Sequence, residues 1–263
     1  MEKPRIEIFN QDLYPWYVDF ERNPKAVWLG HTLMSAVLPR MEFADGARQE
    51  IIDHRNDGGV FLVASSHQSF FDQFYAAAMT RKAPDVFGPL EGIARIPTKQ
   101  GLFTKWDWLR AAIEQMGAYP VIRDKDIKKL LGNELTPYEE ANLINNHIDF
   151  LQASIQMLDN GQDVFIYPQG TRDPQMSKMD KGVGKMAVGV FDQTNLAIIP
   201  MGLHYQRFKL LGKNNPFRAT LFTGNLIKGP FDSAEETNEI VFDTLKYCVE
   251  MATERSPNLL YKK

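Results

Sequence analysis

Apolar residues form short runs that alternate with longer amphipathic stretches from about residue 60 onward. The runs are flanked by glycine or polar residues, as in strands buried on both faces, and they cover 60–64, 118–122, 164–167, 196–201 and 219–223. The stretches between and after them have the apolar spacing of helices and cover 71–82, 102–115, 138–160, 179–193 and 233–255. Strands and helices that take turns predict an α/β domain with a mixed, mostly parallel sheet flanked by helices.

The helix predicted at 138–160 has sequence signals at both of its ends. Thr136 and Glu139 form a capping box with a proline between them, and Gly161 suits the left-handed conformation that often follows a helix. His147 falls on the apolar stripe of this helix. Histidines in such positions are usually part of the packing, so we predict a structural role for His147.

Residues 1–57 differ in pattern from the rest, so we predict an N-terminal helical segment there and the α/β domain at 58–263. The segment carries Trp16, Tyr17 and Trp28, and it has an uncharged stretch at 26–39. That stretch is too short and too polar to span a bilayer, which needs about 20 apolar residues. Two interpretations stay open: this helix packs on the domain, or it lies in a membrane interface with its aromatic side chains at headgroup depth.

The overall charge balance narrows the range of partners. The chain has 30 Lys and Arg against 33 Asp and Glu, a net charge of -3 and a pI near 6.0. It therefore has no overall positive field with which to hold a polyanion, and we expect no nucleic acid partner. Cys248 is the only cysteine and we place it in the core, so no intrachain disulfide forms. The reducing setting and the absence of a secretory signal pattern predict a cytoplasmic protein.

His67 and Asp72 are the first candidate for chemistry, because they follow the strand at 60–64 and open the next helix. Residues five apart on a helix point about 140° away from each other, so this pair meets only if His67 precedes the helix and Asp72 lies on its first turn. In that arrangement Asp72 would hold one ring nitrogen and leave the other as a general base. No third ligand at helix spacing accompanies the pair, so we expect no metal. The alternative is that His67 only caps the helix.

The second candidate is the stretch 167–172, Tyr-Pro-Gln-Gly-Thr-Arg, at the end of a predicted strand. Its glycine permits a tight turn with backbone N–H groups that receive an anion, and Arg172 offers a planar fork suited to phosphate. Lys178, Lys181 and Lys185 follow closely. The alternative is a surface turn with solvated charges.

Taken in order, these stretches resemble the lysophospholipid acyltransferase family, the glycerol-phosphate and 1-acylglycerol-phosphate acyltransferases, over roughly residues 60–223. The family's His-x4-Asp motif matches His67 and Asp72. Its second block, Gly-x-x-x-Val-x-Arg, matches the residues that end at Arg123. Its third block, Phe-Pro-Glu-Gly-Thr-Arg, matches 167–172, and its fourth, an Ile-Val-Pro strand end, matches 198–200. Four motifs in order are much more specific than one.

The resemblance implies an O-acyltransferase that moves a fatty acyl group from acyl-CoA or acyl-ACP, the acyl carrier protein thioester, to a hydroxyl of a lysophospholipid or phosphorylated polyol. His67 would take the hydroxyl proton while Asp72 orients its ring, with no covalent enzyme intermediate. The acyl thioester would be a co-substrate, and no cofactor is expected. The partners implied are the acyl donor, acyl carrier protein among them, a lipid or phosphorylated acceptor, and the cytoplasmic face of a membrane as a peripheral surface.

The same resemblance assigns a substrate-binding set, which comprises Arg123, Gln169, Gly170, Thr171, Arg172 and Lys181. Gln169 departs from the family pattern because it replaces the usual glutamate. We hypothesise that its amide reads a polar group of the acceptor, since an amide donates as well as accepts. Two alternatives keep the fold: a catalytically inactive lipid-binding or interaction protein, and a hydrolase that uses the same histidine and water to cleave acyl thioesters.

Overall fold

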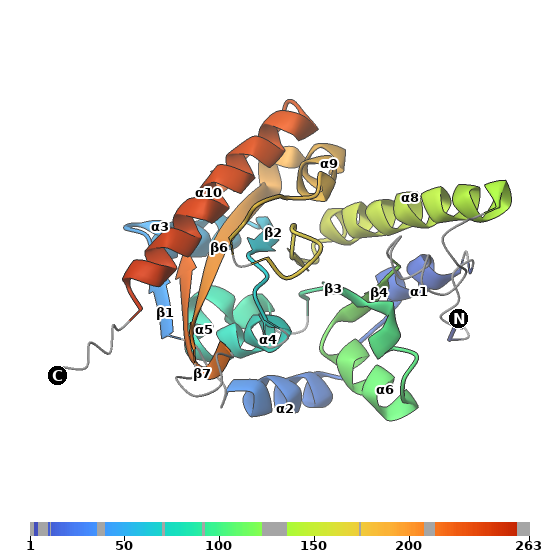
Figure 1. The fold of residues 1–263 in the computed structure, drawn as a ribbon, viewed down its shortest axis with the longest axis horizontal. Helices are drawn as coiled ribbons and strands as arrows, with labels where there is room; N and C mark the ends of the chain where they lie inside the picture. The colour runs from blue at the N-terminus through green and yellow to red at the C-terminus, as the bar shows by residue number, and fades with distance from the viewer. Residues whose placement is uncertain are drawn as a thin grey trace.

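A main sheet covered by helices on both faces organises the computed structural model (Figure 1). The structure describes residues 3–4, 10, 12–35, 40–69, 72–90, 93–122, 136–173, 175–207 and 214–256. The main sheet contains β1 (Arg40–Phe43), β2 (Val60–Ser65), β5 (Val164–Ile166), β6 (Leu196–Arg207), β7 (Asn214–Thr223) and β8 (Ile227–Lys228). A separate two-stranded sheet contains β3 (Ile96–Lys99) and β4 (Ala118–Val121).

The strand order of the main sheet is β1-β7-β6-β2-β5, with β8 paired to β6. Strands β5, β2 and β6 run parallel, β7 and β8 run antiparallel to β6, and β1 runs parallel to β7. The predicted fold class, a mixed and mostly parallel sheet flanked by helices, is therefore confirmed. The strand expected at 118–122 lies instead in the small sheet, where β4 pairs in parallel with β3.

Helices cover both faces of the main sheet, and some of them pack on other helices or on the small sheet instead. They are α1 (Leu13–Asp19), α2 (Pro24–Ser35), α3 (Ala47–Asn56), α4 (Asp72–Lys82), α5 (Pro84–Phe87), α6 (Asp107–Gln115), α8 (Pro137–Asp159), α9 (Gly182–Gly189) and α10 (Ala234–Glu254). Alternate residues of β2 separate the layers: Leu62 and Ala64 join the core under α8, α9 and α10, whereas Phe61 and Val63 join the core with α3, α4 and α5. This alternation is what a strand buried on both faces produces.

The capping box predicted for the first of the two long helices is present in the structure. The side chain of Thr136 accepts from the backbone N–H of Glu139, whose carboxylate accepts from the backbone N–H of Thr136. The side chain of Ser233 likewise accepts from the N–H of Glu236 at the start of α10. Cys248 is buried on α10, as predicted, and burial raises the pKa of its thiol to about 12.

The N-terminal segment forms two helices and then contributes to the main sheet. Helix α1 buries Leu13 and Tyr17 in the core beside α8, and α2 packs on α4 through Val27 and His31 (Figure 1). Residues 40–56, which follow, form β1 at one edge of the main sheet and α3 on its flank. The segment is thus connected to the α/β core through a strand as well as through helices.

Candidate active site

The loop between β2 and α4 carries His67 and is held against β6. The N–H of Ser66 donates to the carbonyl of Met201 at 2.9 Å, and its Oγ accepts from the N–H of Leu203 at 2.8 Å. The side-chain amide of Gln68 donates to the carbonyl of Leu203. Because β2, β5 and β6 run parallel there, the loop lies at the carboxyl ends of neighbouring strands, where open α/β sheets bind their ligands.

His67 and Asp72 contact each other in the geometry expected from their spacing. His67 lies in the loop, α4 begins at Asp72, and Nδ1 of His67 is 2.8 Å from Oδ2 of Asp72. The same Oδ2 accepts from the backbone N–H groups of Gln68, at 2.6 Å, and Ser69, at 2.8 Å. The other oxygen, Oδ1, accepts from the hydroxyl of Tyr205 on β6. The side chain of Asp72 is fully buried, whereas that of His67 is 16% exposed.

These contacts select one tautomer of His67. The Asp72 carboxylate only accepts hydrogen bonds, so the proton of the neutral ring is on Nδ1. Nε2 is then the nitrogen whose lone pair is available to take a proton from another molecule. The ring packs against Tyr167, with ring centroids 4.6 Å apart, which limits its rotation. The pair can therefore work as a general base with an orienting carboxylate.

Gln169 holds the backbone on both sides of this site and is 1% exposed. Its Oε1 accepts from the N–H of His67, and its Nε2 donates to the carbonyl of Asp173. The N–H of Asp173 in turn donates to the carbonyl of His67 at 2.9 Å. The amide that we expected to read the acceptor is thus used within the protein, where it ties the His67 loop to the turn after β5.

Gly170 follows in a left-handed conformation, with φ of +61°. A Cβ atom at this position would lie 2.2 Å from Oδ2 of Asp180, so glycine lets the carboxylate approach the turn closely. The N–H of Gly170 donates to the carbonyl of Tyr167 at 3.1 Å, which closes the turn at the end of β5.

A cavity of about 680 Å³ opens at His67 and brings together most of the predicted site residues. Its apolar wall includes Ile122, Phe150, Leu151, Ile166, Val183 and Met186. Four lysines also line it, namely Lys99, Lys178, Lys181 and Lys185, together with one acid, Asp180. The cavity therefore combines an apolar wall with an excess of positive charge.

The predicted substrate-binding residues have three different outcomes. Gln169, Gly170, Thr171 and Lys181 line the cavity beside His67. Arg172 is exposed and is not part of the cavity wall. Arg123 lies outside the described residues.

Comparison with known proteins assigns the family. The model of the acyltransferase family matches residues 47–204, which is more than half of the chain. The chain belongs to the acyltransferase family. The matched part of the acyltransferase includes both His67 and Asp72 and the turn after β5.

One solved structure similar to this acyltransferase is the crystal structure of the 1-acyl-sn-glycerophosphate (LPA) acyltransferase PlsC from Thermotoga maritima. The two chains are 15% identical, the TM-score is 0.47, and the alignment covers 88% of this chain and 80% of that chain. A comparison with curated proteins finds no match. Among the described residues of the acyltransferase, none of the helices has the length and apolar character that crossing a membrane requires.

Three cavity or site residues of the acyltransferase were not expected from the sequence. His147, predicted to be structural, is exposed and lines the cavity, because the first half of α8 extends beyond the sheet. Ile144 and Ile148 on the same half are also exposed. Lys99 and Tyr205 carried no local signal, since β3 and the second half of β6 were not predicted.

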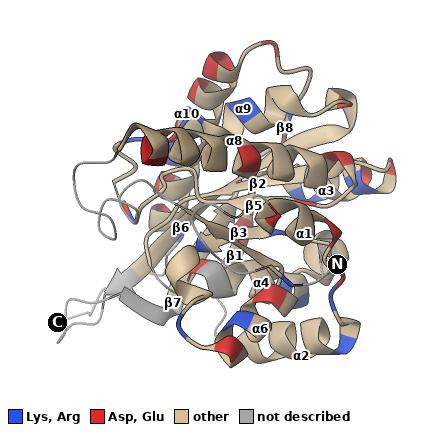
Figure 2. Cartoon of the chain, turned by 90° about the vertical axis from the view of Figure 1, so that its right-hand side faces the viewer, with Lys and Arg blue, Asp and Glu red and all other residues tan. Residues whose placement is uncertain are grey.

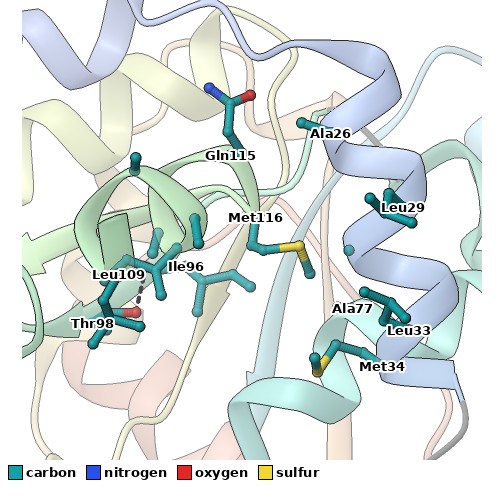
Figure 3. A pocket seen from close by; sticks show the side chains of 15 residues that line it. Ala26, Leu29, Leu33, Met34, Ala77, Ile96, Thr98, Leu109, Gln115 and Met116 are labelled. Carbon is teal, nitrogen blue, oxygen red and sulfur yellow. Dashed lines mark hydrogen bonds between the residues drawn. The ribbon is translucent and has the colours of Figure 1, made fainter. Parts of the chain in front are cut away.

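A second cavity, of about 540 Å³, lies between α2, α4 and α6 (Figure 3). Its lining is almost entirely apolar, and the thioether of Met116 extends toward Leu29 and Leu33 of α2. The small sheet separates the two cavities: Ile96 and Thr98 of β3 line the apolar one, whereas Pro97 and Lys99 line the one at His67. The acyltransferase thus has an apolar cavity that is distinct from the one at its His67 site.

Proposed function

We propose that the protein transfers an acyl group from a thioester, acyl-CoA or acyl-ACP, to a hydroxyl of a lysophospholipid or phosphorylated polyol, with His67 as the general base. The observation that carries the proposal is the buried Asp72 carboxylate, which accepts from Nδ1 of His67 and from three further donors. A carboxylate held in this way orients the ring and leaves Nε2 as the base beside the cavity.

The reaction follows from this geometry. The acceptor hydroxyl gives its proton to Nε2 of His67 while its oxygen attacks the thioester carbonyl, which forms the new C–O bond. Asp72 stabilises the resulting imidazolium through Nδ1–H. The C–S bond then breaks, and the leaving thiolate takes the proton back from Nε2, so that an ester and a free thiol are released. General base catalysis of this kind contributes about 10² to 10⁴ in rate.

The cavity supports an amphiphilic substrate with an anionic group. Its apolar wall suits hydrocarbon, while Lys99, Lys178, Lys181 and Lys185 suit phosphate, for which lysine is a common point-charge partner. A lysophospholipid carries a phosphate, and so do both proposed thioester donors. The arrangement therefore supports binding of either substrate.

We also propose that the protein associates peripherally with the cytoplasmic face of a membrane. Helix α2 packs on α4 with one face, while its other face exposes Trp28 (53%), Leu29 (52%) and Leu33 (60%). Helix α6 lies beside α2 (Figure 2), and Trp106, which precedes α6, and Trp108, in its first turn, are also exposed. Exposed tryptophan and leucine on a mostly uncharged helix are typical of an interfacial surface. One face of α2 thus packs on the domain, and we propose that the other face lies in the membrane interface.

Cations close to the tryptophans support the same proposal. The guanidinium of Arg81 lies 5.6 Å from the ring of Trp28, and Nζ of Lys105 lies 4.2 Å from that of Trp106. Basic groups beside aromatic rings suit the headgroup layer of a bilayer with anionic lipids.

The test is to incubate the purified chain with labelled acyl-CoA or acyl-ACP and a panel of acceptors, and to read product masses. We expect an ester product whose amount depends on a phosphate-bearing acceptor. Thioester loss at the same rate without an acceptor would indicate a hydrolase, and no turnover with any pair would indicate a binding protein.

A further inference from the structure

Tyr205 contacts Asp72 from the opposite side to His67. Its hydroxyl donates to Oδ1 of Asp72 across 133 positions of sequence, and Tyr205 is 4% exposed. The other three donors, His67 Nδ1 and the N–H groups of Gln68 and Ser69, all converge on Oδ2. The Asp72 carboxylate can turn only about its Cβ–Cγ bond, and that turn moves both oxygens. The bond from Tyr205 holds the second oxygen and therefore opposes this rotation together with the bonds to Oδ2.

Tyr75 of α4 supports Tyr205. The two hydroxyls hydrogen-bond, and the rings are stacked with centroids 5.8 Å apart. Because the single proton of Tyr205 is directed at Asp72, Tyr75 is the donor in this bond. Two buried phenols therefore form a short relay, in which Tyr75 donates to Tyr205 and Tyr205 donates to the carboxylate.

Both phenols stay protonated over the physiological range. Burial raises the pKa of Tyr205 far above its usual range, and the charge of Asp72 raises it further. Burial also raises the pKa of Tyr75 to about 12, and the charge of Asp72 adds to this rise. The relay thus presents a donor to Asp72 throughout the physiological pH range.

We infer that Tyr205 is a positioning residue for acyl transfer: its hydroxyl, supported by Tyr75, holds Asp72 in the orientation that fixes the tautomer and tunes the basicity of His67. This inference rests on the proposed role of His67 as the general base. A donor on Oδ1 also withdraws negative charge from the carboxylate, which weakens the stabilisation that Asp72 gives to the imidazolium.

The test is Tyr205→Phe in the full chain, which removes one oxygen and keeps the stacked ring. We expect kcat/KM to fall about 10- to 100-fold, since a hydrogen bond to a charged group is worth roughly one to two powers of ten in rate. The acidic limb of the pH profile should move to higher pH, because the imidazolium gains stability when Asp72 keeps its full charge. Tyr75→Phe should shift the acidic limb in the same direction, by a smaller amount than Tyr205→Phe does.

Tyr119→Phe is the matched control for losing a buried phenol hydrogen bond. Tyr119 is fully buried, and its hydroxyl lies 2.9 Å from Oγ of Ser154 in the other core layer. Tyr119→Phe should lose thermal stability without shifting the acidic limb of the pH profile of kcat/KM. If Tyr205→Phe changes only stability, as the control does, the inference is wrong.

A double-mutant cycle with Asp72→Asn separates the inference from the proposed function. If Tyr205 acts through Asp72, adding Tyr205→Phe to Asp72→Asn should change kcat/KM by less than about twofold, since coupled residues are not additive. Full additivity would overturn the inference. Unchanged activity in Asp72→Asn would instead refute the proposed base.

An NMR measurement decides the inference even if the proposed function fails. The ring ¹⁵N shifts of His67, assigned by their absence in His67→Ala, should report one Nδ1–H tautomer in the natural protein and a mixture in Tyr205→Phe. If Tyr205→Phe does not fold, the same measurement on Tyr75→Phe takes its place, with a smaller mixed fraction expected. An unchanged single tautomer would overturn the inference.

Discussion

Replacing Gln169 by glutamate exchanges the NH₂ group of a buried side chain for oxygen and keeps its volume. In the natural protein Oε1 accepts from the N–H of His67 and Nε2 donates to the carbonyl of Asp173. An ionised glutamate can keep the first bond but places an oxygen against the Asp173 carbonyl. A protonated glutamate can make both bonds, because its O–H donates to that carbonyl.

The size of the effect follows from this pair of bonds. A buried acceptor left without its donor costs about 1–3 kcal/mol, and a charged one costs more. Burial and the facing carbonyl would raise the pKa of the introduced carboxyl group above the unfolded value near 4.3, while the His67 N–H lowers it by less. When folding raises the pKa of a carboxyl group, the folded protein favours the protonated form. The variant therefore keeps its stability below the pKa of the group in the unfolded chain and loses it as pH rises through the pKa in the folded protein. We therefore expect Gln169→Glu to lose about 1.5–3 kcal/mol at pH 7 and less at pH 5.

Thermal unfolding between pH 5 and 8 measures this effect, and each kcal/mol corresponds to about 2–4 °C in Tm for a chain of this size. Gln152→Glu on the exposed face of α8 is the control. The difference in Tm between this variant and the natural protein should not vary between pH 5 and 8. Activity of Gln169→Glu should fall mainly in kcat, because the His67 backbone loses its support. Unchanged stability at every pH, together with a rise in acceptor KM alone, would refute this reasoning and restore a role in reading the acceptor.

Three further predictions test other parts of the site. Asp72→Asn should lower kcat by about 10² to 10⁴, because an amide can place a donor against Nδ1 and favour the wrong tautomer, and steady-state kinetics measures it. Trp28→Asn with Leu33→Gln should weaken binding to anionic phospholipid vesicles by about 10- to 100-fold in a sedimentation assay, since two exposed apolar side chains would no longer enter the bilayer. Gly170→Ala should lose about 1–2 kcal/mol by thermal unfolding for its positive φ and should also lower kcat/KM, because the new Cβ displaces Asp180 at the cavity.

Matched variants sharpen the last two predictions. Ile240→Gln with Tyr247→Asn removes similar exposed apolar groups from α10, and it should leave vesicle binding unchanged. Equal weakening by both pairs would contradict a specific membrane surface on α2. Gly161 has a positive φ and open space around it. Gly161→Ala should therefore lose about as much stability as Gly170→Ala, without a loss of kcat/KM. A catalytic loss as large as that of Gly170→Ala would contradict the role given to Asp180.

The parts of the molecule that could be predicted are those with local causes. The contact of His67 with Asp72 depends only on where α4 begins, and the capping box at Thr136 depends on four consecutive residues. The buried strands could be predicted because alternate residues of β2 both face apolar layers. Strands β1 and β3 could not, since they contain residues such as Glu42 and Lys99 whose strand conformation depends on distant partners.

The parts that could not be predicted depend on contacts between distant segments. The periodicity of α8 placed His147 on the apolar stripe, but only the fold shows that His147 lies at the cavity while Leu143 and Leu158 of the same stripe lie in the core. Tyr205 reaches Asp72 because β6 continues beyond the predicted strand and pairs with β7. The use of the Gln169 amide is set by the backbone of Asp173, which no side-chain pattern reveals.

The most direct test of the central claim is the rate of ester formation by His67→Ala and the natural protein, with one thioester donor and a phosphate-bearing acceptor. Product mass is followed over time, and circular dichroism verifies that the variant is folded. We predict that the natural protein forms the ester only when the acceptor is present, and that His67→Ala forms it about 10² to 10⁴ times more slowly. Ester formation by folded His67→Ala at a rate close to that of the natural protein would contradict the role of His67 as the general base.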